Sequence, residues 1–446
     1  MAGQTETKES LNVEKTSLSH FFKELKSRLT IISQLPENQQ KIDSLGLTKS
    51  DIFKPSLVIG DPGIGKTEGI ISTINAINAD LVKKGLKDSK GNQRQLGFKK
   101  IQLGQLVVGD LAGVPVVMDT GKGQKELIRI HPEDLPNPDR DPEFGVLFID
   151  EITTADEMQI QPALGLCDGS RSIGTYSLPP NWYVVAAGNG PNCTNFVRLD
   201  DMTISRFNVF NVEYNYTQDF EEFAVRNQFH PLILGYLNLH PECVVEIQSD
   251  EYASISDGGN QFPCPRTWTA LAGAIKMQQL TDSLSAVNSN KKINELDPDH
   301  LQLLANGFVG KKHALQLYAF AKIAKKSKID PANILAGKEP KAANEMSMDE
   351  AQVVCEGVLA LYREHLKQTK GKITPALEKE LAHALRWILT MPGHLDLSTQ
   401  MIRQFNHLDK HIALVFVSPT FDSLCPEFNA FLQSHQDFVQ SLVADL

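Results

Sequence analysis

Apolar residues in the first half of the chain follow two alternating patterns. Short, nearly continuous apolar runs bounded by glycine or polar residues predict buried strands at 56–59, 98–103, 145–149 and 182–187. Between them, apolar residues recur at helical spacing, as in the stretch 64–85. Strands that alternate with helices in this way are typical of a mostly parallel sheet covered by helices on both faces. The pattern therefore predicts a three-layer α/β fold.

Three further elements are expected in this half. An amphipathic helix is predicted at 17–35, after the capping candidates Thr16 and Ser17. The turn-forming run Asp-Thr-Gly-Lys-Gly inside 114–130 predicts a β-hairpin between the second and third strands. A second hairpin is expected at 170–178.

Strand patterns become rare after residue 215, and helical periodicity dominates. The helices expected there span 218–238, 267–281, 299–327, 349–368, 375–390 and 425–444. A stretch rich in Pro, Gly and Lys at 326–347 predicts a linker. We therefore expect a flexible N-terminus at 1–16, an α/β domain at 17–215, a helical subdomain at 216–340 and a C-terminal helical region at 345–446.

The charge and the start of the chain narrow the function classes. The 446 residues carry a net charge of −10, so a role in coating nucleic acid would need a local basic patch. No apolar run approaches the roughly 18 residues of a membrane span, and the start MAGQTETKES contains no hydrophobic signal core. The six cysteines are far apart and form no C-x-x-C pair. We therefore expect a cytoplasmic protein with reduced thiols and no membrane partner.

The first predicted strand is followed directly by a glycine-rich segment that fits G-x-x-x-x-G-K-[ST]. The segment is Gly60, Asp61, Pro62, Gly63, Ile64, Gly65, Lys66 and Thr67, and Glu68 extends the expected cofactor-binding stretch. Its glycines let backbone N–H groups curl around phosphate oxygens, and the next helix adds partial positive charge. Lys66 supplies a full charge to the β- and γ-phosphates, and the Thr67 hydroxyl is a ligand for Mg²⁺. The position between a strand and a helix favours a nucleotide-binding loop over an accidental glycine-rich turn.

Two adjacent acids end the strand predicted at 145–149. Asp150 can hold the coordination shell of Mg²⁺, and Glu151 can orient and polarise a water at the γ-phosphate. Taken alone, an Asp-Glu pair is better explained as a helix N-cap followed by a first-turn acid. Together with the phosphate loop, the pair favours a site for ATP and Mg²⁺.

With these residues in place, the chain resembles AAA+ ATPases, and among them the MoxR-like branch. The resemblance rests on GDPGIGKT between a strand and a helix, on FIDE at a strand end, and on the run LVVGDLAG at 106–113. The hairpin at 114–130 falls where that branch carries an inserted hairpin. The resemblance covers about residues 20–275 and implies an AAA+ αβα domain at 17–215 with an all-α lid at 216–340.

Two polar residues gain roles from this resemblance. Asn189, after the fourth strand, matches the sensor 1 position, which holds the attacking water beside Glu151. Without the resemblance, a turn-forming Asn before Gly is the simpler explanation. Arg266, after Pro265, matches the sensor 2 position on a lid helix. Arginine is electrostatically unfavourable at a helix start, which favours a partner anion over a purely structural role.

The resemblance also implies an arginine finger at Arg206, in LDDMTISRF. Such an arginine reaches the γ-phosphate of a neighbouring subunit and stabilises the charge of the transferring phosphoryl group. One alternative is a surface ion pair with Asp200 or Asp201. Another is that Arg198 is the finger.

Other candidate chemistry is sparse. His407 and His411 are spaced for one helical face, but no third ligand accompanies them, so we expect a surface or packing role rather than a metal site.

The residues and the resemblance together predict a Mg²⁺-dependent ATPase that assembles as a homo-oligomer, a hexameric ring. The family implies chaperone-like remodelling of a protein partner, often beside a von Willebrand A-type protein. Two alternatives remain open. A nucleic-acid-directed motor or loader is disfavoured by the acidic composition, and a nucleotide switch that barely hydrolyses is disfavoured by Glu151.

Overall fold

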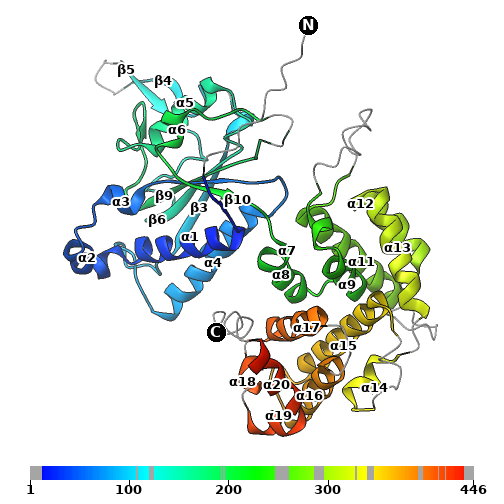
Figure 1. The fold of residues 1–446 in the computed structure, drawn as a ribbon. Helices are drawn as coiled ribbons and strands as arrows, with labels where there is room; N and C mark the ends of the chain where they lie inside the picture. The colour runs from blue at the N-terminus through cyan, green and yellow to red at the C-terminus, as the bar shows by residue number, and fades with distance from the viewer. Residues whose placement is uncertain are drawn as a thin grey trace. The chain divides into compact units, whose positions relative to one another are not determined.

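The computed structural model describes most of the chain. The described residues are 13–106, 109–119, 125–191, 193, 196–246, 261–285, 296–326, 329–338, 346–389, 395–409, 411–416 and 418–435. The chain divides into two compact units, Met1–Tyr214 and Asn215–Leu446. Figure 1 shows a sheet with flanking helices in the first unit and a helical array in the second.

The first unit is built on a six-stranded parallel sheet in the order β1-β10-β2-β9-β6-β3. Its strands are β1 (Lys15–Thr16), β2 (Ser56–Ile59), β3 (Leu96–Gln102), β6 (Phe144–Asp150), β9 (Trp182–Gly188) and β10 (Asn208–Val212). The four apolar runs predicted as strands are β2, β3, β6 and β9, so this prediction is confirmed. The last residue of β2, Ile59, is in register with Asn211 of β10 and Gly188 of β9. The loop after β2 therefore starts beside the carboxyl ends of both neighbouring strands, where α/β proteins bind their ligands.

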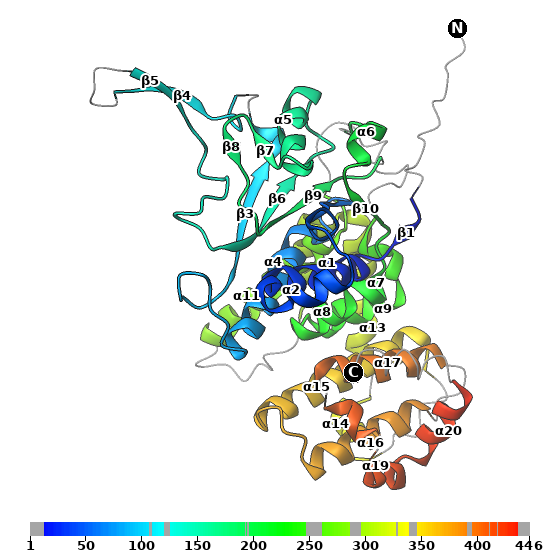
Figure 2. The same cartoon turned by 90° about the vertical axis from the view of Figure 1, so that its left-hand side faces the viewer.

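Helices cover both faces of this sheet because its central strands are apolar on both sides. Along β6, Leu147 and Ile149 share a core with α5, and the side chains between them point to the opposite face. Figure 2 shows α1 and α4 on one face of the sheet and α5 on the other. The helices are α1 (Leu18–Ser33), α2 (Leu35–Ser44), α3 (Lys49–Phe53), α4 (Lys66–Lys83), η1 (Leu103–Gln105), α5 (Glu157–Cys167) and α6 (Asp201–Ile204). The predicted three-layer αβα fold class, with a parallel sheet and an inserted β-hairpin, is confirmed.

The N-terminal segment corrects one expectation. Residues 1–16 were predicted to be flexible, but Lys15–Thr16 form β1 and pair in parallel with the end of β10. The helix predicted at 17–35 is confirmed as α1, and Ser17 caps it by accepting a hydrogen bond from the His20 backbone N–H at 3.1 Å.

Two antiparallel hairpins accompany the sheet, and both were predicted. They are β4 (Val114–Asp119) with β5 (Lys125–Ile130), and β7 (Ser172–Ile173) with β8 (Tyr176–Ser177). The first hairpin presents apolar side chains to solvent, with Val117 60% and Leu127 70% exposed. Its tip at 120–124, and residues 107–108 of the predicted LVVGDLAG motif, lie outside the described residues.

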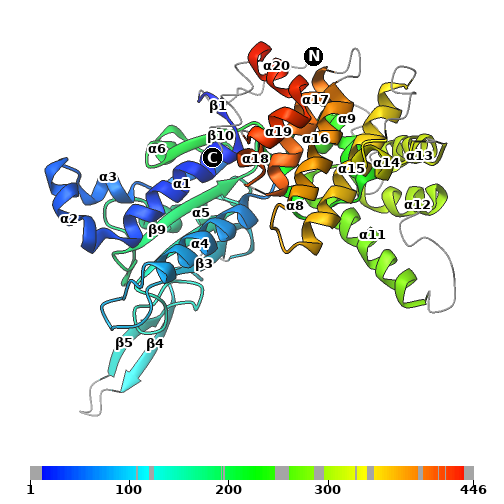
Figure 3. The same cartoon turned by 90° about the horizontal axis from the view of Figure 1, so that it is seen from below.

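The second unit is helical (Figure 3). Its elements are α7 (Tyr216–Asp219), α8 (Glu221–Arg226), α9 (Pro231–Leu239), η2 (Pro241–Val244), α11 (Pro265–Ser285), α12 (Pro298–Val309), α13 (Lys311–Lys326), α14 (Pro331–Leu335), α15 (Met348–Gln368), α16 (Pro375–Leu389), α17 (Leu395–Leu408), α18 (Ile412–Val415), α19 (Pro419–Leu424) and α20 (Pro426–Ser434). The continuous helices predicted at 218–238 and 299–327 are wrong, because both stretches are interrupted. The linker predicted at 326–347 contains the short helix α14. Within the described ranges, no helix combines the length and apolar character that crossing a membrane requires.

Candidate nucleotide-binding site

The loop between β2 and α4 adopts a backbone that only its glycines favour. Gly63 and Gly65 have φ angles of 79° and 95°, in the left-handed region that disfavours side chains. A Cβ atom on Gly60 would come within 3.1 Å of Val212 Cβ, so the loop begins where β2 and β10 pack closely. The Gly60 N–H donates to the Gly188 carbonyl at 3.3 Å, which ties the start of the loop to the end of β9. Contacts with β9 and β10 therefore hold the start of the predicted phosphate loop in place.

Lys66, the first residue of α4, points back into this loop. Its Nζ donates to the carbonyl oxygens of Gly60 at 2.7 Å and Asp61 at 2.9 Å, and lies 3.5 Å from Asn189 Oδ1. The Lys66 side chain is buried, so its charge is held inside the loop. The structure therefore brings together Lys66 and Asn189, which are 123 positions apart in the sequence.

The other loop residues differ in exposure. Ile64 is buried and anchors the loop. Burial raises the pKa of the Asp61 carboxyl, although the nearby Lys66 opposes this effect. Thr67 and Glu68 lie in the first turn of α4, with Thr67 half-buried and Glu68 exposed. The negative charge of Glu68 is favourable near the N-terminus of α4, where the helix dipole is positive. A role of Glu68 in binding a cofactor stays a prediction.

The acidic pair lies at the carboxyl end of β6. Asp150 Oδ2 lies 2.7 Å from Lys100 Nζ on β3, and Asp150 Oδ1 accepts a hydrogen bond from the Glu151 N–H at 3.0 Å. Glu151 has a φ angle of 60°, which is uncommon for a residue with a side chain and directs the chain sharply away from the strand. A Cβ atom on Gly104 would lie 3.3 Å from Glu151 Oε2, so the carboxylate packs closely against the η1 segment.

Thr153 connects the acidic pair to Asn189, and the sequence reasoning missed it. The Thr153 hydroxyl accepts a hydrogen bond from the Asn189 N–H at 2.7 Å and donates to the Asn189 carbonyl at 3.1 Å. The Ile152 N–H donates to the Ala187 carbonyl at 3.0 Å. Thr153 is 1% exposed, so both hydrogen bonds are protected from water. This side chain fixes the loop after β9 to the loop after β6.

Lys100 was also missed, although a signal was present. A lysine inside a predicted strand of a parallel sheet needs a partner, and the only strand ends rich in acid were those at Asp150 and Glu151.

The donor set suits Mg²⁺, which prefers oxygen ligands such as the Thr67 hydroxyl and a carboxylate. Both Asp150 oxygens already contact protein donors, so Asp150 would hold the ion through its remaining lone pairs or through water.

Arg206 follows α6 and is half-exposed. Its Nη1 lies 3.5 Å from the Met202 carbonyl, and in the described part of the chain it forms no ion pair with Asp200 or Asp201. Asp200 instead caps α6 by accepting a hydrogen bond from the Thr203 N–H at 2.7 Å. Hydrogen bonds from Thr203 lower the pKa of the Asp200 carboxyl, and the nearby charge of Arg206 adds to this effect. The surface interaction with Asp200 therefore stays an alternative, and the arginine-finger role stays a prediction.

Arg266 belongs to the second unit, where it is exposed at the second position of α11. Pro265 opens this helix as predicted, and the following Thr267 hydroxyl accepts a hydrogen bond from the Cys264 N–H at 2.9 Å. Pro265 and this hydrogen bond define the start of α11, and the sensor 2 role of Arg266 stays a prediction.

Comparisons with known proteins add little beyond this geometry. No protein-family model matches the sequence, and no curated protein sequence is significantly similar to it. Among solved structures, the chain is similar to C. elegans PCH-2, with 14% identity, 70% of each chain covered and a TM-score of 0.29. It is also similar to a putative ATPase from Cytophaga hutchinsonii ATCC 33406, with 14% identity, 82% of this chain and 86% of that chain covered, and a TM-score of 0.23. Because both TM-scores are low, our interpretation rests on the strand order and on the loop contacts of the chain itself.

Proposed function

We propose that this chain is a Mg²⁺-dependent AAA+ ATPase that converts ATP to ADP and phosphate. The observation that carries the proposal is the glycine-shaped loop after β2, which holds Lys66 within 3.5 Å of Asn189 Oδ1. Thr153 links Asn189 in turn to the strand that ends in Asp150. A cation, an amide and two carboxylates from three strand ends are the groups that phosphoryl transfer to water requires.

Each residue has a separate part in this mechanism. Lys66 and the loop N–H groups would bind the β- and γ-phosphates in place of the carbonyls that Lys66 contacts here. Bound Mg²⁺, held by Thr67 and Asp150, would neutralise charge on the phosphate oxygens. Glu151 would take the proton of the attacking water, and Asn189 would orient that water.

We further propose that the active form is a homo-oligomeric ring of MoxR-like type, in which Arg206 completes the site of a neighbouring subunit. Support comes from the half-exposed position of Arg206, whose Nη1 donates a long hydrogen bond of 3.5 Å to the Met202 carbonyl. The exposed apolar side chains of the β4–β5 hairpin offer a contact surface for a subunit or a protein partner. Remodelling of a protein partner, such as a von Willebrand A-type protein, fits this arrangement better than nucleic-acid binding, because the chain is acidic overall.

Lys66→Ala tests the binding site. We expect ATP affinity to fall by roughly 10–100-fold or more, because charge-assisted hydrogen bonds to phosphate are lost. Isothermal titration with ATP and Mg²⁺ measures this directly. Lys83→Ala is a matched control, since Lys83 lies at the exposed end of the same helix. Undiminished ATP affinity in Lys66→Ala would mean that this loop is not part of the nucleotide-binding site.

Thr153→Val tests the link between the two strand ends. Valine keeps the shape but leaves the Asn189 N–H unpaired and buried, at a cost of about 1–3 kcal/mol. We expect turnover to fall by about 10-fold or more, with ATP binding retained through Lys66. Thr73→Val is the control, because the Thr73 hydroxyl donates within α4, to the Gly69 carbonyl at 2.8 Å, and has no other hydrogen bond among the described residues. Equal turnover in both variants would mean that Thr153 has no part in positioning Asn189.

Turnover measurements also separate the alternatives. Strong stimulation by single- or double-stranded DNA would favour a nucleic-acid-directed motor. Tight ATP binding with no measurable hydrolysis in the wild-type chain would favour a nucleotide switch.

A further inference from the structure

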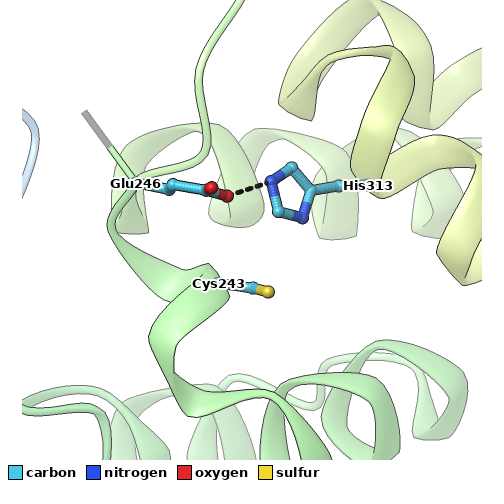
Figure 4. A group of neighbouring side chains, drawn as sticks. All are labelled: Cys243, Glu246 and His313. Carbon is cyan, nitrogen blue, oxygen red and sulfur yellow. Dashed lines mark ion pairs between the residues drawn. The ribbon is translucent and has the colours of Figure 1, made fainter. Parts of the chain in front are cut away.

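A second cluster of chemically reactive side chains lies in the helical unit. Among the residues that the structure describes, Cys243, Glu246 and His313 form a group whose ligand atoms all lie within 4.8 Å of one another. Figure 4 shows the three side chains converging from η2, from the segment after it, and from α13. Cys243 and His313 are buried and Glu246 is half-buried. The cluster belongs to the second unit, and none of its three residues has a role in the mechanism proposed above.

The hydrogen bonds around His313 favour one of its two neutral tautomers. Its Nδ1 lies 3.1 Å from the Tyr236 hydroxyl, and that hydroxyl donates to Gln316 Oε1 at 2.7 Å. With Gln316 presenting Oε1, the single proton of the Tyr236 hydroxyl goes to that oxygen, and the hydroxyl accepts a hydrogen bond from Nδ1–H of His313. The lone pair of the neutral ring is therefore on Nε2, as in a histidine that binds a metal and has its other nitrogen fixed by a neighbour.

This lone pair points at a second acceptor. His313 Nε2 lies 2.7 Å from Glu246 Oε2, yet both atoms are buried and neither has a hydrogen-bond partner of acceptable geometry. The other carboxylate oxygen of Glu246 is paired with Lys312 Nζ at 2.6 Å, which turns Oε2 toward the imidazole. A cation between these two buried atoms, either a proton or a metal ion, would satisfy both of them.

We propose that Cys243 Sγ, Glu246 Oε2 and His313 Nε2 form a binding site for a zinc-like transition-metal ion in the helical unit. A thiolate, an imidazole and a carboxylate are typical zinc ligands, whereas Mg²⁺ and Ca²⁺ prefer oxygen alone. Zinc–ligand bonds of about 2.0–2.3 Å place neighbouring ligand atoms roughly 3.2–3.6 Å apart, so only small side-chain shifts are required. A water molecule would take the fourth position, and Cys243 would lose its thiol proton on binding.

Hydrogen bonds hold the backbone around the cluster in place. Trp268 Nε1 donates to the Cys243 carbonyl at 3.0 Å, and the Glu246 N–H donates to the Pro263 carbonyl at 3.2 Å. These contacts tie the metal-binding segment to the start of α11, and His313 adds α13. The ion would therefore join three elements of the helical unit.

Cobalt titration of the full chain tests the proposal. Co²⁺ replaces zinc in such sites, and a cysteine ligand produces a thiolate-to-cobalt charge-transfer band in the near ultraviolet. We expect this band to saturate at one equivalent of Co²⁺ in metal-stripped wild-type protein. Co²⁺ bound at the nucleotide site lacks a thiolate and gives no such band, so the result is independent of the proposed ATPase. Absence of the band in the wild type would overturn the proposal without any mutation.

Matched cysteine variants locate the ligand. Cys243→Ser should eliminate the band, and Cys264→Ser, which alters another buried cysteine of the same unit, should keep it. A band that persists in Cys243→Ser would assign the thiolate elsewhere and overturn the site. Stability provides a second readout on the wild-type chain. Zn²⁺ at about 100 times its Kd should raise the melting temperature of metal-stripped protein by roughly 5 °C or more. No rise would mean that His313 and Glu246 form an ion pair only.

Discussion

Glu151→Gln should bind ATP and Mg²⁺ as the wild type does, but hydrolyse ATP about 10²–10⁴-fold more slowly. The amide keeps the size of the side chain and its place beside η1, where a Cβ on Gly104 would lie 3.3 Å from Oε2. It loses the charge that takes a proton from water. The backbone φ of 60° is as acceptable to Gln as to Glu, so the local fold should persist. Single-turnover hydrolysis and ATP titration measure the two effects separately.

The control for this experiment is Glu157→Gln. Glu157 is an exposed acid in the first turn of α5, so it repeats the charge change close to the site without touching it. Wild-type turnover in Glu151→Gln would mean that another group activates the water, and Asn189 would be the next candidate. If turnover does fall, the ATP-bound Glu151→Gln protein is the natural bait for a protein partner.

The strands that were predicted are those whose burial is visible as a pattern in the local sequence. β2 and β6 are buried on both faces, so each is a continuous apolar run that needs no knowledge of its neighbours. β10 has the sequence Asn-Val-Phe-Asn-Val and is half-buried. The two-residue β1 is a strand because it pairs with β10. The order of strands depends on such long-range pairing, which no local pattern contains.

The helix errors had local signals that the periodicity obscured. Pro231 begins α9 after His230, and the residue before a proline disfavours helix. Gly310, with a φ of 84°, separates α12 from α13. In both stretches the apolar spacing continues across the break, because the two helices on either side contribute to the same unit.

The residues of the site likewise fall into those that a local pattern predicts and those that it does not. Residues of the phosphate loop and the acidic pair could be found from spacing, because their chemistry requires a continuous motif. Thr153 and Lys100 act through partners that only the folded sheet supplies. The cluster around Cys243 was missed because its histidine lies on a different helix, and only the Cys-x-x-Glu spacing of Cys243 and Glu246 is local.

Arg206→Ala should leave ATP binding nearly unchanged and reduce turnover by about 10³–10⁵-fold, the usual contribution of an arginine finger. The side chain is half-exposed, and its only hydrogen bond that the structure describes is to the Met202 carbonyl at 3.5 Å. α6 is capped by Asp200 independently of Arg206, so the variant should fold normally. Arg198→Ala, in the same segment, is both the control and the test of the alternative finger.

Mixing of variants gives the sharpest test, because a finger acts on the site of a neighbour. Arg206→Ala subunits keep the phosphate loop and lack the finger, whereas Lys66→Ala subunits keep the finger and lack a working loop. In mixed assemblies some interfaces pair an intact loop with an intact finger, so turnover should partly return. A surface arginine cannot give this result, since its loss would cost about 1 kcal/mol or less and leave turnover near normal. If mixed assemblies form but stay inactive, Arg206 does not act across subunits. If Arg206→Ala alone keeps wild-type turnover, the finger must be Arg198 or be absent, and only in the second case would hydrolysis no longer require assembly.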